Sequence, residues 1–436
     1  ATMTAQAIAH IQSVYRKGFL SYATMRGIKG DVQTLLLSES NQTHIEDCDD
    51  ILKQTTAIFQ QRVESAKATP AKRIGEILKT NGKSREDAFK AILGAIKTTH
   101  ERHSNHVKVK DKTISVGLVR LERVKDCVAL AEFIRTHASL IGMPIKILMN
   151  HGGFTNAERA YKYRTLSNLL KRSGEKDAIL EDPDVLSMLQ SHKDSAVAII
   201  TTSVGERGND YDFDWAITEP TSISSMIQLA GRVGRHRQLN ITQPNFSILQ
   251  YPVNPGKGFR NDIHEMKGDD ITVGVCDEFL KKIDSRALLG DESLAHMPLL
   301  QVGLKHRLLN DKDFLKNLEK TSSNGHIGIA ASSFYKPPLR SKQKQHTIEI
   351  DENGEFLDSI TGHAIAIGYK KYDDEHFDDL MFGAWRRSDV YSIVFDQCNM
   401  PSWQRKIGRQ VTHSVYEEGD DMSPFVCSDA LGLFKP

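Results

Sequence analysis

Apolar positions along the chain change their spacing near residue 108, and this change divides the chain into parts. From residue 4 to about residue 106, apolar side chains such as Ile8, Ile11 and Val14 recur three residues apart, without any alternation of strand type. This spacing predicts helices. Beyond residue 108, short apolar runs predict strands separated by helices. The predicted strands are 113–121, 144–149, 196–201, 214–218 and 246–251, and the predicted helices are 125–138, 156–172 and one that starts at residue 222.

The order of these elements predicts the fold class. Strands that alternate with helices at this spacing form a parallel sheet covered by helices on both faces, which is the α/β class. Prolines and glycines over residues 252–258 mark the end of this domain. Residues 272–320 again have a helical pattern, and residues 336–345 (KPPLRSKQKQ) have the prolines and basic residues of an exposed linker.

The end of the chain carries a hairpin signal. Residues 346–350 and 355–360 flank Asn353-Gly354, a dipeptide that favours the tight turns of hairpins. We therefore predict a C-terminal domain that contains β-structure. In total the pattern predicts four parts: a helical connection at 1–107, the α/β domain at 108–258, a helical linker at 259–345 and the C-terminal domain at 346–436.

Composition narrows the class of protein. The 436 residues carry 57 Lys plus Arg and 56 Asp plus Glu, a net charge of +1, which excludes a histone-like partner on bulk charge alone. No apolar run approaches the ~18–20 residues of a membrane span and no signal peptide is evident, so we expect a cytoplasmic protein without a membrane partner. The five cysteines are isolated from one another, which excludes a disulfide framework and a cysteine zinc site.

Charge is uneven along the chain. Residues 71–112 contain eleven Lys or Arg against five Asp or Glu. Such a basic helical face could bind a phosphate backbone, and a solvated charged surface is the alternative. His100, His103 and His106 lie in the same stretch, where we expect solvated side chains rather than metal ligands.

Residues 198–235 carry the most informative chemistry. A buried strand ends in Thr201-Thr202-Ser203, and ligands bind at the carboxyl ends of strands in open α/β sheets. Gly205 and Gly208 allow the backbone to approach a phosphate, and Asp210 can accept a hydrogen bond from a ribose hydroxyl or a water. Taken alone, such a glycine-rich turn is weak support for a nucleotide site.

The predicted helix from residue 222 adds two guanidinium groups. On a helical wheel, Gln228, Arg232 and Arg235 share the polar face, opposite an apolar face that would pack on the sheet. Guanidinium groups stay charged and bind phosphate oxygens in a bidentate fork, so arginines serve as clamps in phosphoryl transfer. The alternative is that they only complement the dipole at the end of the helix.

These motifs resemble those of a known family. TSVGERGNDYDFDW followed by QLAGRVGRHR is similar to motifs V and VI of superfamily 2 helicases, and the fuller form is most similar to the helicase-nuclease of type I CRISPR interference, particularly subtype I-F. The resemblance implies the second of two RecA-like domains, in which Arg232 and Arg235 reach the γ-phosphate of ATP. Gln228, Gly208 and Asp210 would complete the nucleotide site.

The resemblance also extends upstream of these motifs. Residues 115–123 (SVGLVRLER) look like motif IV, and residues 147–159 (ILMNHGGFTNAER) look like the following block. It implies that the backbone of single-stranded DNA is contacted by four residues, for each of which a structural or solvent role is the alternative: Arg120, His151, Gly152 and Thr202. Two positions depart from the family pattern, namely Gly205, where a bulkier apolar residue is usual, and Leu229, where many relatives have arginine.

Several family motifs are absent from the chain. It contains no phosphate-binding loop G-x-x-x-x-G-K-[ST], no D-E-x-[DH] box and no His-Asp dipeptide. Ala1-Thr2 resembles the end of the S-A-T segment that closes the first RecA-like domain. We therefore expect the C-terminal portion of a longer protein, with the ATP-binding half and the nuclease domain missing. ATP and Mg²⁺ would bind between the two halves, a divalent transition metal would bind only in the nuclease domain, and we predict no metal site in this chain.

The resemblance implies a function for the whole protein. It would be an ATP-dependent translocase that moves 3′ to 5′ along single-stranded DNA and feeds the strand to a nuclease for degradation of target DNA. Its partners would be single-stranded DNA, the CRISPR surveillance complex and the missing N-terminal half. The alternatives are a non-catalytic RecA-like scaffold or DNA-binding module, and an RNA helicase of the same superfamily, which the D-x-D-W…E-P form disfavours.

Overall fold

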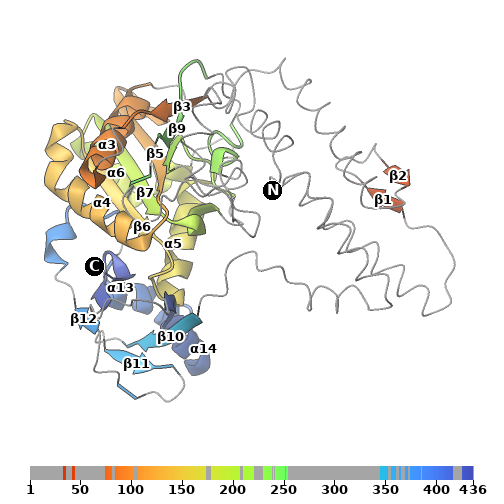
Figure 1. The fold of residues 1–436 in the computed structure, drawn as a ribbon, viewed down its shortest axis with the longest axis vertical. Helices are drawn as coiled ribbons and strands as arrows, with labels where there is room; N and C mark the ends of the chain where they lie inside the picture. The colour runs from red at the N-terminus through yellow and green to blue at the C-terminus, as the bar shows by residue number, and fades with distance from the viewer. Residues whose placement is uncertain are drawn as a thin grey trace.

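The structure, a computed structural model, has a parallel sheet at its centre (Figure 1). It describes residues 33–35, 42–44, 74–80, 84–102, 107–172, 178–206, 210–219, 229–237, 239, 241–250, 252–253, 344–351, 355–359, 363–364, 369–371, 374–383, 385–415 and 425–435. Six parallel strands follow one another across the sheet: β3 (Gly75–Leu78), β9 (Phe246–Leu249), β8 (Trp215–Thr218), β5 (Lys112–Arg120), β7 (Asp194–Thr201) and β6 (Ile145–Asn150). A seventh strand, β4 (Val107–Val109), pairs antiparallel with the start of β5.

Helices cover both faces of this sheet because the strands are apolar on both sides. Ala196, Ala198 and Ile200 of β7 pack in one core with α3 (Arg85–Glu101) and α4 (Val124–His137). The alternate residues Val197 and Ile199 are equally buried and point to the other face. That face carries α6 (Pro183–Ser191), which contacts β5 and β7. The remaining helical segments of this region are η1 (Ala138–Leu140), α5 (Asn156–Leu169), η2 (Ala178–Glu181) and η3 (Ser203–Glu206).

The predicted α/β fold with a parallel sheet is confirmed. Each of the five predicted strands overlaps an observed one, β5, β6, β7, β8 and β9, and the first two predicted helices overlap α4 and α5. The start of the predicted helix at residue 222 and the helical pattern at 272–320 lie outside the described residues.

The prediction of an entirely helical segment from residue 4 to residue 106 is wrong. Within it, β1 (Gln33–Leu35) and β2 (Gln42–His44) form an antiparallel pair, and β3 joins the central sheet beside β9. The sheet thus includes residues before the predicted start at 108. β3 has only four residues and is held by a distant neighbour, since the Asn245 side-chain oxygen accepts from the Ile74 amide at 3.0 Å. A strand of this length shows no alternation that a sequence pattern could detect.

The expectation of a solvated His100 is also wrong. His100 is buried at the end of α3, and its Nδ1 lies 2.8 Å from Ser115 Oγ of β5. The basic stretch therefore includes a face that packs on the sheet. His103 and His106 lie outside the described residues.

In its described residues, the C-terminal region contains two small sheets and four short helical segments. The predicted hairpin is confirmed by the antiparallel pairing of β10 (Lys344–Ile350) with β11 (Phe356–Asp358), in which Ile350 is opposite Phe356. β10 also pairs with β13 (Gln410–Val415), while β14 (Phe425–Ser428) pairs with β12 (Tyr369–Lys371) and β15 (Gly432–Phe434). The helical segments are η6 (Glu375–Phe377), α13 (Arg387–Tyr391), the π-helical turn η7 (Ser392–Asp396) and α14 (Ser402–Gly408).

This region lies against the β6 edge of the central sheet (Figure 1). Ile147 of β6 accepts from the amide of Phe382 and donates to the carbonyl of Leu380, both at 2.8 Å, so one short segment continues the sheet beyond β6. The Leu433 amide donates to the Gly153 carbonyl at 2.7 Å. Among the described helices, none combines the length and apolar character needed to cross a membrane.

Candidate functional site

The carboxyl ends of three adjacent strands form one edge of the sheet. Arg120 at the end of β5 and Asn150 at the end of β6 are both in register with Thr201 at the end of β7. The loops that follow these strands therefore lie side by side. Arg120 and these loops include the four residues that the family resemblance assigns to DNA.

Arg120 lies inside this edge. Its side chain is buried, and its Nε donates to Glu206 Oε1 at 2.7 Å while Nη1 donates to Glu122 Oε2 at 2.5 Å. Burial opposes the charge, but Glu122 and Glu206 outweigh burial and raise the pKa of Arg120. A contact with DNA would have to replace these carboxylates, and it stays a prediction.

The loop after β6 holds His151 and Gly152. His151 is fully buried beside Phe154, with 4.7 Å between the ring centroids, and its Nδ1 accepts from the Gly153 amide at 3.2 Å. Burial, followed by the charge of Lys162, lowers the pKa of His151 to about 3, so the ring is neutral at pH 7. Gly152 is partly exposed, its φ is not positive, and a Cβ built on it would meet no atom within 4 Å.

Among the four residues predicted to contact DNA, Gly152 is thus the one with free space beside its Cα. Neither its backbone conformation nor its neighbours require glycine, which leaves close approach of a ligand as a physical reason for one. Thr202 is buried, and its carbonyl accepts from the amide of Gly205 at 3.0 Å. A Cβ at Gly205 would lie 2.6 Å from Thr201 Cγ2, so this turn has no room for the bulkier side chain of the family pattern. The predicted DNA contacts of His151, Gly152 and Thr202 remain predictions.

The helical-wheel arrangement predicted for the arginines is wrong. The described part of the helix ends at Ala230, and the next amides, of Arg232 and Val233, donate three residues back rather than four. Val233 then forms a parallel bridge with Phe213, and Gly234 turns the chain with a φ of 55°. Arg235 therefore lies beyond the helix and does not share a helical face with Arg232. Gln228 and Gly208 lie outside the described residues.

Arg232 and Arg235 have different surroundings. Arg232 is buried and donates through Nη2 to the carbonyl of Glu206, and burial followed by the charge of Arg235 lowers its pKa. The Arg235 side chain is 29% exposed, and its Nε is 2.8 Å from Asp210 Oδ1, on a carboxylate side chain that is 70% exposed. His236 Nε2 lies 3.0 Å from the same oxygen. Among the described residues, the Arg235 guanidinium thus pairs with a carboxylate that is well solvated.

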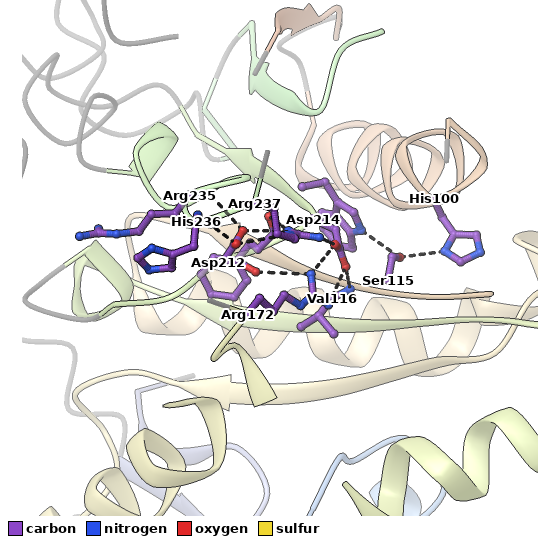
Figure 2. Close-up of polar contacts among 11 residues, drawn as sticks. His100, Ser115, Val116, Arg172, Asp212, Asp214, Arg235, His236 and Arg237 are labelled. Atoms are coloured by element: carbon purple, nitrogen blue, oxygen red, sulfur yellow. Dashed lines mark hydrogen bonds and ion pairs between the residues drawn. The ribbon is translucent and has the colours of Figure 1, made fainter. Parts of the chain in front are cut away.

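Two buried aspartates fix the segment that carries Arg235 (Figure 2). Asp212 accepts from the amides of Arg235 at 2.9 Å and His236 at 3.1 Å. It also accepts from two nitrogens of the Arg237 guanidinium, at 2.8 and 3.1 Å. Asp214 accepts from the Val116 amide at 2.6 Å and from Arg237 Nη1 at 2.7 Å. It also forms a fully buried ion pair with Arg172, which follows α5.

Sequence reasoning did not identify this cluster as a structural unit. The pattern D-x-D-W contributed to the family resemblance, but no sequence feature pairs Asp214 with Arg172, 42 residues earlier. The cluster joins the segment before β8 to residues 235–237, which follow the described helical residues 229–230. Buried carboxylates of this kind hold their partners in one geometry because each lost hydrogen bond is costly.

A second buried group resembles a catalytic triad but is structural. Ser115 Oγ contacts His100 Nδ1 (Figure 2) and accepts from Trp215 Nε1 at 3.1 Å. His100 Nε2 is 3.9 Å from Asp194. Ser115 is fully buried in β5, so no substrate can reach its hydroxyl. Within the described ranges, no group of His, Cys, Asp and Glu side chains could hold a metal ion.

Comparisons with known proteins confirm the family resemblance. Residues 113–238 match the family described as CRISPR-associated nuclease/helicase Cas3, C-terminal. The chain is 26% identical over 332 residues to CRISPR-associated nuclease/helicase Cas3 subtype I-F/YPEST of Pseudomonas aeruginosa (strain UCBPP-PA14), which covers 71% of this chain and 31% of that protein. The protein of the same description from Pectobacterium atrosepticum is 29% identical over 259 residues, covering 52% of this chain and 22% of that protein.

Among solved structures, the crystal structure of T. fusca Cas3-ATP covers 83% of this chain and 40% of that one, with 13% identity and a TM-score of 0.40. By its two curated relatives, the chain is similar to a part of Cas3 of subtype I-F/YPEST. It spans less than a third of the length of the two curated relatives.

Proposed function

We propose that this chain supplies the second RecA-like domain of an ATP-dependent translocase on single-stranded DNA, within a CRISPR helicase-nuclease. The observation that carries the proposal is the placement of Arg235 in a segment that Asp212 holds against the residues before β8. Its guanidinium is partly exposed and paired with a solvated carboxylate, while Asp212 holds its backbone. A phosphate can compete for such a guanidinium because an exposed ion pair contributes little stability, ~0–1 kcal/mol.

The side chains of Arg235, Asp210 and Arg232 fit the γ-phosphate of ATP presented by a first RecA-like domain. Arg235 would bind its oxygens, and Asp210, released from that ion pair, would be free to accept from a water or a ribose hydroxyl. Arg232 is more buried and donates to the backbone of Glu206, so we assign it the support of this turn with a second contact to phosphate. Together with Mg²⁺, ATP supplies the phosphoryl transfer that drives the cycle.

We place the single-stranded DNA over the loops that follow β5, β6 and β7. Gly152 is open to a backbone phosphate, and binding through phosphates without base contacts makes movement independent of sequence. The relatives are CRISPR-associated nuclease/helicases, which supports the CRISPR surveillance complex as a partner and a nuclease domain elsewhere in the protein. The 3′ to 5′ direction belongs to the same proposal.

The test is to make Arg235→Ala and Arg235→Lys in the full-length protein and to measure DNA-stimulated ATP hydrolysis. If Arg235 stabilises charge in the transition state, both variants should lose ~10³-fold or more in kcat with a smaller change in ATP affinity. Lysine should not rescue, because a point charge does not reproduce the planar fork.

Two controls accompany this test. Melting of both variants should match the wild type, since the carboxylate paired with the Arg235 side chain in the described part of the chain is exposed. Hydrolysis within about threefold of wild type, or a loss that follows unfolding, would show that Arg235 is structural. The chain of residues 1–436 alone should hydrolyse no ATP, because it has no phosphate-binding loop.

A further inference from the structure

The short helix α14 presents an apolar face to solvent. Trp403 is 62% exposed and Ile407 is 48% exposed, two of the five large hydrophobic side chains that are exposed among the described residues. Positions four apart lie on one side of a helix, so the indole and the isoleucine form one surface. A tryptophan left this exposed is costly unless a partner covers it.

The helix is held firmly in place. Arg405 donates to the Met400 carbonyl and to Asp396 Oδ1, each at 2.8 Å, which ties α14 to η7. Gly408 ends the helix so close to Phe395 that a Cβ there would lie 2.6 Å from the ring. The exposed face is therefore a fixed platform and not the surface of a loose end.

The position of α14 places it near the proposed path of the single-stranded DNA. Asn156, the first residue of α5, donates from Nδ2 to the Ile407 carbonyl at 2.8 Å. Asn156 is four residues after Gly152, the open glycine of the β6 loop. Figure 1 shows α14 near α5, and the two helices are in contact. The helix that carries Trp403 is therefore attached to the start of α5, four residues after Gly152.

The charges around the platform favour a polyanion. Residues 401–415 contain Arg405, Lys406 and Arg409 and no acidic residue. On the α5 side, Arg159 is half-buried and donates to Asn156 Oδ1. In the described part of the chain, neither Arg159 nor the exposed Lys406 forms an ion pair. The one acidic group that contacts α14 in the described part of the chain, Asp396, is paired with Arg405. An exposed indole with cations on its own helix and on the contacting helix is a combination that binds nucleic acid strands, with bases on the ring and phosphates on the cations.

A protein partner fits this surface less well. A stable protein interface buries about 800 Å² on each side and uses about 20 residues or more. Two apolar side chains on a helix of seven residues are too few for such a core, but they are enough for one stacked base.

We infer that Trp403 and Ile407 form a stacking platform for a base of single-stranded DNA, with Lys406 and Arg159 on the adjacent phosphates. The inference rests on the proposed function, since the platform is a further subsite for the same single-stranded DNA. The platform would let the C-terminal region hold this DNA beside the RecA-like domain. Because every base has an aromatic face, such a platform does not depend on sequence.

The experiment measures fluorescence anisotropy of a labelled oligothymidine of about 20 nucleotides with the full chain and its variants. Trp403→Ala should weaken binding about tenfold, and Trp403→Phe should recover most of the affinity. Leu140→Ala is the matched control, because Leu140 is 67% exposed but lies in η1, at the opposite end of β6. It should bind like the wild type.

Two further measurements separate stacking from charge. On a strand of the same length with abasic sites, wild type and Trp403→Ala should bind equally. Lys406→Ala should lower the slope of log affinity against log salt by ~0.7, and Trp403→Ala should leave that slope unchanged. Equal melting of Trp403→Ala and wild type would show that the helix remains folded.

The outcomes distinguish the two proposals. If wild type binds the oligothymidine and Trp403→Ala binds within twofold of it, the platform is wrong while the translocase proposal stands. If Trp403→Ala keeps its affinity for DNA but loses binding to a surveillance complex, the platform is a protein-docking site and the inference is overturned. If wild type does not bind single-stranded DNA at all, both proposals fail.

Discussion

Asp212 is the residue on which the geometry of the arginine segment depends most. Its carboxylate is fully buried and accepts four hydrogen bonds, two from backbone amides and two from Arg237. Asp212→Asn would place an amide donor against these donors. We expect a loss of ~3 kcal/mol in the free energy of unfolding, because a buried ion pair loses one partner. Chemical denaturation, monitored by tryptophan fluorescence, gives the free energy of unfolding of the variant and of the wild type.

Asp210→Asn is the matched control for this change. Asp210 is two residues away but well exposed, so the same substitution should change the free energy of unfolding by less than ~0.5 kcal/mol. Equal stability of the two variants would mean that the Asp212 cluster does not hold the segment.

Glu219, which follows β8, gives a prediction of pH dependence. Its carboxyl accepts from the amides of Glu122 at 2.5 Å and Val253 at 2.7 Å. Burial, despite these bonds, raises the pKa of Glu219 from 4.5 to about 7. The folded state therefore binds this proton more tightly than the unfolded chain, so the stabilising contribution is complete below pH 4.5 and is lost as pH rises through about 7.

The variant Glu219→Gln isolates that contribution because it cannot titrate. Between pH 5 and pH 8, wild type should lose on the order of 2 kcal/mol of stability relative to Glu219→Gln. The two chains share His151 and every other titrating group, so those effects cancel in the difference. A difference that stays constant across this pH range would contradict the prediction.

At the scale of elements, the contact between β15 and the loop after β6 depends on one glycine. A Cβ at Gly153 would lie 2.1 Å from the carbonyl oxygen of Leu433, while a Cβ at the adjacent Gly152 would meet nothing. Gly153→Ala should therefore displace β15 and lower the melting temperature by several degrees, and Gly152→Ala should melt like the wild type. Hydrogen exchange of the Leu433 amide, which donates to Gly153, should rise only in Gly153→Ala.

The same pair tests the proposed DNA path. If a phosphate approaches Gly152 closely, Gly152→Ala should weaken binding to single-stranded DNA without any loss of stability. Full DNA affinity in Gly152→Ala would remove this glycine from the path.

Sequence predicted the elements whose signal is local. β5, β7 and β8 are continuous buried runs, and such runs between helical segments indicate a parallel sheet. The placement of Arg235 could not be predicted in this way, because it depends on Gly234 adopting a positive φ and on Phe213 pairing with Val233. β3 was missed because its partner β9 is 171 residues away in sequence. The motifs thus identified the family, while the surroundings of each arginine required the fold.

At the scale of the molecule, the C-terminal region protects an edge of the central sheet. β6 is the last strand on its side, and an uncovered edge strand invites pairing with other chains. Residues 380–382 cover part of that edge through Ile147. Arg387 of α13 joins the two regions, since it is buried between Glu158 of α5 at 3.2 Å and Asp429 at 2.8 Å.

Neighbouring arginines in this region provide a comparison of a buried and an exposed charge. Arg387→Met would leave the buried Glu158 without its cation, which should cost ~3–5 kcal/mol of stability and loosen the C-terminal region. Arg386 is exposed and 3.8 Å from an exposed Asp378, so Arg386→Met should change stability by less than ~0.5 kcal/mol. Chemical denaturation gives the two values, and hydrogen exchange at Phe382 and Leu433 reports whether the region has detached. If Arg387→Met is as stable as Arg386→Met and both amides stay protected, the ion pair with Glu158 does not hold the C-terminal region on the sheet, and backbone pairing along β6 suffices to cover the edge.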